Sequence, residues 1–322
     1  MGFFMPVVRM LLISVLFAAL ASLSAAAQGM LKLQSAEKEP LRAQGMPGPQ
    51  GAEEEPLRTQ MWLVPSPDGE TLAHAVLFRP SGEGPYRLAV VAHASTQNTL
   101  LRTLMPQPEY RPLAAFLVAR GFAVLVPERP GHGATGGNYL EDQNGCDGAD
   151  YVHAGRATAQ EISAALNFMR GQPFIRRDGA VVIGHSAGGW GALALSDSDP
   201  AEISSIIAIA PGRGGQPNGI PNQICAPHTL VSAAGEFGHA ARIPVTWLVS
   251  ANDGYFSPEV SKKMSDAFRG GGGKVDFRVL PAYASEGHWM IETQRGVAMA
   301  ASELERALTG ATAARPTPPK KP

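Results

Sequence analysis

The sequence has little net charge and no basic stripe. Its 322 residues carry 27 lysines and arginines against 28 aspartates and glutamates, a formal net charge of −1 at pH 7. Nothing in this balance favours nucleic acid as a partner. Hydrophobic residues make up 44% of the chain, an ordinary proportion for a globular protein with a sizeable core.

Cysteine is scarce, with only Cys146 and Cys225 in the whole chain. Neither lies in a metal-ligand or C-x-x-C spacing, and neither follows a strand and sharp turn as a nucleophile would. In an oxidising compartment the two are a candidate disulfide, with two separate thiols as the alternative. Four loop histidines also lack the spacing of a two-histidine, one-carboxylate site, so we predict no metal: His132, His153, His228 and His239.

A long apolar run occurs at the amino terminus. Arg9 precedes residues 10–23, and the run ends in Ala25-Ala26-Ala27-Gln28, a signal-peptidase pattern. We therefore predict a cleaved signal peptide over residues 1–27, a periplasmic or secreted protein, and no stable membrane span after cleavage. An uncleaved membrane anchor is the alternative, but the run is shorter than the roughly 20 residues that span a bilayer.

Two further segments are expected to be disordered. Residues 28–59 form a polar linker in which Ala36–Arg42 recurs with one change as Ala52–Arg58, a repeat too short for a solenoid unit. Residues 311–322 form a Pro-rich tail. The interval 60–310 is left as one α/β domain.

Short apolar strands alternate with helical patterns across this domain, which is typical of a mostly parallel sheet covered on both faces. The predicted strands are Met61–Val64, Leu72–Phe78, Leu88–Ala92, Ala123–Val126, Val181–Ile183, Ile203–Ile209, Val245–Val249 and Val275–Leu280, the first two antiparallel. The predicted helices are Pro112–Arg120, Ala154–Arg170, Ala187–Ser196, Pro258–Arg269 and Thr293–Leu308. Two Gly/Pro/Asn-rich intervals, Gly136–Tyr151 and Gly212–Ile243, are expected to be binding loops, which a disulfide would tie together.

A serine lies at the corner between a predicted strand and a predicted helix. The segment Gly184-His185-Ser186-Ala187-Gly188 follows the strand Val181–Ile183 directly. Such a turn exposes the serine hydroxyl above the sheet and aims the next backbone N–H at the reacting carbonyl. Glycine at both ends avoids collisions of a Cβ with the neighbouring strand or helix. A plain tight turn is the alternative, and the choice depends on partners for the serine.

A serine hydroxyl needs a base to take its proton and an acid to orient that base. Asp253 lies just beyond the strand Val245–Val249, and His288 follows the next strand in a glycine-containing loop. We predict a Ser186, Asp253, His288 triad, in the chain order nucleophile, acid, base. An ordinary Asn-Asp-Gly turn and an ordinary surface histidine are the alternatives.

Acyl transfer also needs donors for the oxygen that becomes negative. The backbone N–H of Ala187 is predicted to be one donor because it directly follows the nucleophile. The second is predicted in the loop after Leu88–Ala92, from the N–H of Ser95, with Ala94 less favoured. His93, in the same loop, is interpreted as a structural hydrogen-bonding residue and not as the base.

Several of these segments together resemble the α/β-hydrolase superfamily, in particular dienelactone-hydrolase-like proteins, over about Leu72–Leu308. They are His93-Ala94-Ser95, Pro127–Gly133, Gly184–Gly189, Asn252-Asp253 and Gly287-His288, in this order. The resemblance implies an α/β-hydrolase fold with a mostly parallel eight-stranded sheet, helices on both faces and loop insertions over the active site. It also implies the triad above, water as the second substrate, and no metal or organic cofactor.

The sequence departs from this pattern at two positions. Ala94 replaces the glycine of the usual His-Gly loop motif, which would narrow or re-aim the oxyanion site. Ser186 stands where dienelactone hydrolases have cysteine, so dienelactones are not expected as substrates. The sequence therefore predicts an exported serine hydrolase that cleaves small-molecule carboxylic esters through an acyl-enzyme. A prolyl-oligopeptidase-like peptidase, or a non-catalytic binding protein on the same fold, are the alternatives; ester specificity and oligomeric state are not predicted.

Overall fold

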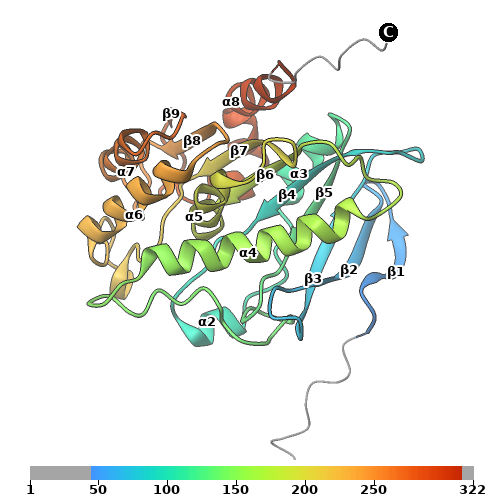
Figure 1. The fold of residues 1–322 in the computed structure, drawn as a ribbon, viewed down its shortest axis with the longest axis horizontal. Helices are drawn as coiled ribbons and strands as arrows, with labels where there is room; N and C mark the ends of the chain where they lie inside the picture. The colour runs from blue at the N-terminus through green and yellow to red at the C-terminus, as the bar shows by residue number, and fades with distance from the viewer. Residues whose placement is uncertain (1–44, 314–322) are drawn as a thin grey trace, which may run out of the picture. The chain divides into compact units, whose positions relative to one another are not determined.

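The computed structural model describes residues 45–313, and those from Met46 onward belong to one compact unit. The predicted signal peptide, most of the predicted linker and the tail from residue 314 lie outside the described residues. A nine-stranded sheet runs through the unit in the order β1-β2-β3-β5-β4-β6-β7-β8-β9 (Figure 1). The strands are β1 (Gly48–Glu54), β2 (Thr59–Pro65), β3 (Leu72–Phe78), β4 (Arg87–Ala92), β5 (Phe122–Pro127), β6 (Ala180–His185), β7 (Ile203–Ile209), β8 (Val245–Ser250) and β9 (Val275–Leu280).

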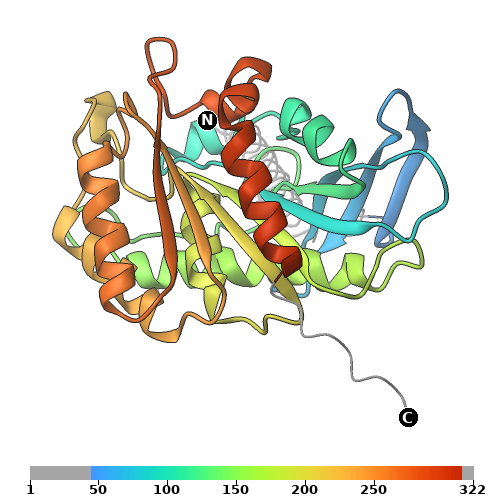
Figure 2. The same cartoon turned by 90° about the horizontal axis from the view of Figure 1, so that it is seen from above.

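Helices cover both faces of this sheet. They are α2 (Thr99–Thr103), α3 (Arg111–Val118), α4 (Tyr151–Arg170), α5 (Ala187–Ala194), α6 (Pro227–Ala240), α7 (Pro258–Gly270) and α8 (Gln294–Ala313), with short 3-10 helices η1 (Leu195–Asp197), η2 (Pro217–Gly219) and η3 (Met290–Glu292). The apolar residues of α4, α5, α6 and α7 share one core cluster, and those of α3 and α8 share the other. Figure 2 shows the same division, with α3 and α8 on one side of the sheet and α4 and α7 on the other.

The central strands are mainly apolar because both of their faces are buried. In β4, Leu88 and Val90 point into one cluster, while Ala89 and Val91 point into the other. The pairs from β5 through β9 are all parallel, whereas β1, β2 and β3 add antiparallel pairs at one edge. The mostly parallel sheet and the antiparallel opening strands are thus confirmed. Because parallel strands end at one edge, the loops after β4, β6, β8 and β9 meet there.

The sheet has one strand more than the eight that the sequence predicts. Residues 48–54, assigned to the disordered linker, form β1 and pair with the edge of β2. Six of the seven β1 residues are exposed, so the segment carries no apolar alternation that would signal a strand. Its backbone pairing, together with ion pairs from Glu53 to Arg58 and Arg79, holds it in place.

A helix replaces part of the predicted loop Gly212–Ile243. The glycines and the proline of α6 indicate a loop by composition, but Leu230, Ala233 and Phe237 are buried on one helical face. A Cβ on Gly238 would lie only 2.0 Å from the Phe268 carbonyl oxygen, so glycine here permits close packing of α6 on α7. The short helix α2 was not predicted either. None of the helices among residues 45–313 is long and apolar enough to cross a membrane.

Candidate active site

Ser186 lies at the strand-to-helix corner between β6 and α5, as the glycine pattern predicts. Its backbone has φ 55° and ψ −117°, a conformation that a residue with a side chain rarely adopts. A Cβ at Gly188 would lie 2.2 Å from the Ala92 carbonyl oxygen, and one at Gly184 would lie 2.3 Å from that of Gly188. The two glycines therefore let β4, β6 and α5 approach closely enough to hold the serine in this conformation.

Asp253 and His288 are brought together from loops that follow β8 and β9. Asp253 Oδ2 lies 3.0 Å from His288 Nδ1, and both side chains are buried. The other carboxylate oxygen, Oδ1, accepts the backbone N–H groups of Tyr255 at 2.9 Å and Phe256 at 2.8 Å. Those two bonds fix the carboxylate so that Oδ2 faces the imidazole.

Glu286 ties the acid loop to the histidine loop. Its Oε1 accepts the N–H of Gly254 and the N–H of His288, each at 2.9 Å. Asn252 adds a second link, since its side chain donates to the carbonyls of Tyr283 and Ala284, both at 3.1 Å. The distance between Asp253 and His288 is thus set by backbone contacts on both sides. No local sequence pattern marks Glu286 for this role.

The free edge of the His288 ring is available to act as a base. Nε2 is buried and has no hydrogen-bond partner among the described residues, and no hydrogen bond joins it to Ser186. Burial lowers the pKa of His288, partly offset by the bond to Asp253, so the ring is neutral near pH 7 with its proton facing the carboxylate. Tyr255 stacks on the ring at 4.2 Å between centroids. In unliganded enzymes the bond from nucleophile to base is often long and shortens on substrate binding.

The loop after β4 lies against the turn that carries Ser186. The N–H of Gly188 donates to the His93 carbonyl at 3.1 Å. The N–H of Ala94 donates to the Tyr110 hydroxyl at 3.1 Å and is therefore already engaged. Of the two candidates for the second oxyanion donor, this contact favours Ser95. The N–H of Ala187 lies in the first turn of α5, where helical N–H groups have no intrahelical acceptor.

The Ser95 side chain is held by His132, a residue to which the sequence analysis gave no role. His132 Nδ1 faces the carbonyls of Arg129 at 3.0 Å and Pro130 at 3.1 Å, so Nδ1 carries the proton. Nε2 then accepts the Ser95 hydroxyl at 2.7 Å. Burial and the positive charge of Arg129 lower the pKa of His132 to about 3, which keeps the ring neutral.

A buried ionic cluster supports the same loop from below. Arg129 Nη1 donates to the His93 carbonyl at 2.9 Å, and Arg129 Nε pairs with Glu141 at 3.1 Å. Arg213, from the loop after β7, also pairs with Glu141. Glu161 lies 3.3 Å from Arg129, and burial raises the pKa of this glutamate to about 8. With this pKa Glu161 is mostly protonated near pH 7, so Glu141 is the carboxylate that compensates the buried charges of Arg129 and Arg213.

The disulfide between Cys146 and Cys225 is present, with 4.8 Å between the two Cα atoms. It joins the loop that carries Glu141 to the loop that carries Arg213. The prediction that a disulfide would tie these two intervals together is confirmed.

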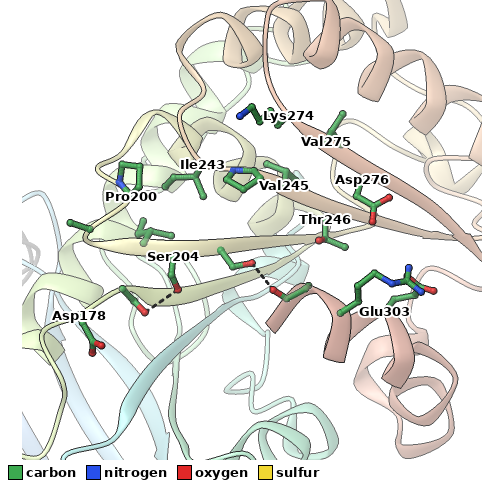
Figure 3. Close-up of a pocket in the computed structure, with 17 residues that line it drawn as sticks. Asp178, Pro200, Ser204, Ile243, Val245, Thr246, Lys274, Val275, Asp276 and Glu303 are labelled. Carbon is green, nitrogen blue, oxygen red and sulfur yellow. Dashed lines mark hydrogen bonds and ion pairs between the residues drawn. The ribbon is translucent and has the colours of Figure 1, made fainter. Parts of the chain in front are cut away.

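A large cavity, drawn in Figure 3, lies at the amino ends of the strands, the opposite edge of the sheet from these residues. Its volume is about 790 Å³, and it is lined by the amino ends of β7, β8 and β9 and by α8, including Ser204, Val245, Val275 and Glu303. None of the predicted site residues lines it. In parallel sheets ligands bind at the carboxyl ends of the strands, so this cavity is not where we place the chemistry.

Comparison with known proteins agrees with this architecture. Residues 89–318 match the family model described as "Alpha/beta hydrolase family". The chain belongs to the alpha/beta hydrolase family. The matched residues include Ser186, Asp253 and His288, and family membership supports hydrolysis as the reaction class. No curated protein matches this alpha/beta hydrolase.

Solved structures with the same fold include esterases and peptidases. A protein assigned as a dienelactone hydrolase from Klebsiella pneumoniae is 14% identical, covering 80% of this chain and 99% of its own, with a TM-score of 0.53. A cold-adapted esterase from an Arctic intertidal metagenomic library is 19% identical over 81% of this chain and 99% of its own, with a TM-score of 0.53. A puromycin-hydrolyzing peptidase of Mycobacterium tuberculosis is 13% identical over 80% of this chain but 40% of its own, with a TM-score of 0.52. At these identities the likeness shows the alpha/beta hydrolase fold alone.

Proposed function

We propose that this alpha/beta hydrolase is an exported serine esterase. Ser186 Oγ attacks the ester carbonyl carbon while His288 Nε2 takes the hydroxyl proton, and Asp253 stabilises the resulting imidazolium. The N–H groups of Ala187 and Ser95 bind the oxyanion. Collapse of the tetrahedral intermediate breaks the bond to the alcohol oxygen, which receives the proton from His288. Water, activated by the same imidazole, then releases the acid and restores Ser186.

One observation carries the proposal. The Asp253 carboxylate holds His288 Nδ1 at 3.0 Å, while Nε2 of the same buried ring has no hydrogen-bond partner in the described part of the chain. The backbone carbonyl of His288 lies 2.9 Å from the ring of His185, the residue that directly precedes Ser186. A neutral histidine oriented by a carboxylate, in a loop bonded to a strained strand-to-helix turn that carries a serine, is an arrangement suited to nucleophilic catalysis.

Ester cleavage is favoured over peptide cleavage by the extent of the structural likeness. The Arctic esterase is matched along 99% of its own chain, whereas the peptidase is matched along 40%. Export is supported by the signal-peptide pattern and by the Cys146–Cys225 disulfide, since structural disulfides persist mainly in oxidising compartments.

Turnover measurements test the proposal directly. The purified protein is assayed on short p-nitrophenyl esters and on peptide p-nitroanilides, beside Ser186→Ala and the control Ser265→Ala, a buried serine on α7. We expect ester hydrolysis that falls at least about 10³-fold in Ser186→Ala and is unchanged in Ser265→Ala. Turnover of peptides without esters would establish the peptidase alternative. Absence of any Ser186-dependent turnover would favour a non-catalytic binding protein.

A further inference from the structure

His185, the residue directly before the nucleophile, is buried and makes hydrogen bonds through both ring nitrogens. Nε2 lies 2.9 Å from the backbone carbonyl of His288, a residue 103 positions away in the sequence. Nδ1 lies 2.8 Å from the hydroxyl of Tyr110. The ring therefore connects the nucleophile turn to the backbone of the proposed base.

Tyr110 extends this connection to the loop after β4. Its hydroxyl accepts the backbone N–H of Ala94 at 3.1 Å, and the side chain is buried. Tyr110 precedes α3 with φ 49°, a left-handed conformation that turns its ring toward the sheet edge and that a residue with a side chain adopts at a cost. Burial raises the pKa of Tyr110 well above its usual value, so the hydroxyl keeps its proton.

The two ends of this chain of bonds fix its proton arrangement. An amide N–H can only donate and a carbonyl oxygen can only accept. His185 must therefore carry a proton on Nε2. The Tyr110 hydroxyl faces both His185 Nδ1 and the Glu292 carboxylate, and Nδ1 accepts its proton when the ring is neutral. The order is Ala94 N–H to Tyr110 Oη–H to His185 Nδ1, and then His185 Nε2–H to the His288 carbonyl.

We propose that Tyr110 and His185 are positioning residues that hold the proposed oxyanion loop and the proposed base in register with Ser186. The inference rests on the proposed esterase function. Each of the three catalytic parts is carried by a different loop, and this single chain of hydrogen bonds touches all three. A displacement of about 1 Å in such a constellation can cost about 10²-fold in rate.

Two titratable side chains, Glu292 and His288, lie close to the His185 ring. Glu292 Oε1 lies 3.5 Å from His185 Nδ1, and the His288 ring lies 5.0 Å away between centroids. The contact with His185 lowers the pKa of Glu292 against the raising effect of burial. A positive charge on His185 would lower the pKa of His288. Glu292 also makes a side-chain hydrogen bond with Tyr110, so Tyr110, Glu292 and His288 are the titratable groups that face the His185 ring.

Steady-state kinetics test the positioning role. Rates are normalised to the sites that react with a fluorophosphonate probe, so that misfolded protein does not count. In Tyr110→Phe we expect kcat to fall about 10- to 100-fold with KM changed less than about twofold. The control is Tyr86→Phe, which removes the hydroxyl of a buried tyrosine at the opposite edge of the sheet, and its kcat should equal that of the wild type. An unchanged kcat in Tyr110→Phe would overturn the proposal.

Two substitutions of His185 distinguish its bond to the His288 carbonyl from its bond to Tyr110. His185→Gln keeps an amide N–H near the place of Nε2, whereas His185→Asn keeps a polar atom only near the place of Nδ1. We expect the glutamine variant to retain at least about tenfold more kcat than the asparagine variant, because it preserves the bond to the base loop. Equal activity of the two variants, at wild-type level, would contradict a positioning role.

The hydrogen-bond chain can also be observed without any activity. Multiple-bond ¹H–¹⁵N NMR spectra distinguish the two neutral tautomers of histidine, and the His185 signals are assigned by their loss in His185→Asn. We expect the Nε2–H tautomer at pH 7 and a shifted Nδ1 signal in Tyr110→Phe. The Nδ1–H tautomer or a charged ring would overturn the inference. If wild-type turnover does not depend on Ser186 while the tautomer is as expected, the proposed function fails and the chain of bonds stands.

Discussion

His288 is subject to two opposing effects. Burial lowers its pKa, whereas the bond to Asp253 raises it, and burial prevails. A base must be neutral to accept the serine proton, so the rate should decline only when the pH falls below the ordinary histidine value of about 6.5.

The pH dependence of kcat/KM for a soluble p-nitrophenyl ester tests whether the base has a lowered pKa. We expect the half-maximal rate on the acid limb to lie below pH 6.5. In Asp253→Asn the imidazolium loses its partner, so the acid limb should move to still lower pH as the rate falls. An acid limb centred above pH 7 in the wild type would be incompatible with a buried, neutral base.

The free energy of unfolding should also decrease as the pH falls. The folded-state pKa values of His288 and His132 are lowered, that of His132 to about 3, while both histidines titrate near 6.5 in the unfolded chain. Below pH 6.5 the unfolded state binds more protons, and the free energy of unfolding decreases as the pH falls toward the folded-state values. The burial that keeps both rings neutral near pH 7 therefore also makes the folded protein less stable in acid.

Among the elements, the site depends on two loops that contain neither an α-helix nor a strand. The loop after β5 supplies His132 and Glu141, and the loop after β7 supplies Arg213, which meets Glu141 beneath the Ser95 loop. The disulfide Cys146–Cys225 joins these two loops across 79 residues of sequence. It limits the freedom of both loops in the unfolded chain and keeps the ionic partners together in the folded one.

Removing the disulfide should therefore destabilise the protein. In the double variant Cys146→Ser, Cys225→Ser we expect the free energy of unfolding in urea to fall by about 2–4 kcal/mol. Wild-type protein with reductant should match the double variant, and reductant should not affect the double variant itself. Alkylation without reductant, followed by intact mass measurement, should modify neither cysteine. Equal stability of wild type with and without reductant would show that the bond does not stabilise the fold.

For the whole molecule, the sequence predicted the alternation of apolar strands and helices along the chain. All eight expected strands are present. In β4 to β8 the side chains are buried on both faces, and this burial leaves an apolar run that can be read locally, whereas β9 has only one buried residue. β1 was missed because six of its seven side chains are exposed, so it carries no apolar alternation. α6 was missed because glycines that serve packing against α7 are also typical of loops.

The site was predictable to the extent that chemistry constrains residue type. A strained turn needs Gly184 and Gly188, and an acid and a base must follow strands in a given order, so these positions could be named from spacing. The contacts of Tyr110 with His185, 75 residues apart, and of His185 with His288, 103 residues apart, leave no local pattern. Such residues became visible only when the fold brought distant loops to one edge of the sheet.

Mass-spectrometric mapping of a fluorophosphonate adduct identifies the nucleophilic residue itself. The wild-type protein is treated with the probe and digested, and the modified peptide is sequenced. We expect one phosphonyl adduct, on Ser186. This adduct should be absent when the protein is unfolded by heat before treatment and in the Ser186→Ala variant. An adduct on another serine such as Ser95, or no adduct on folded protein, would contradict this expectation.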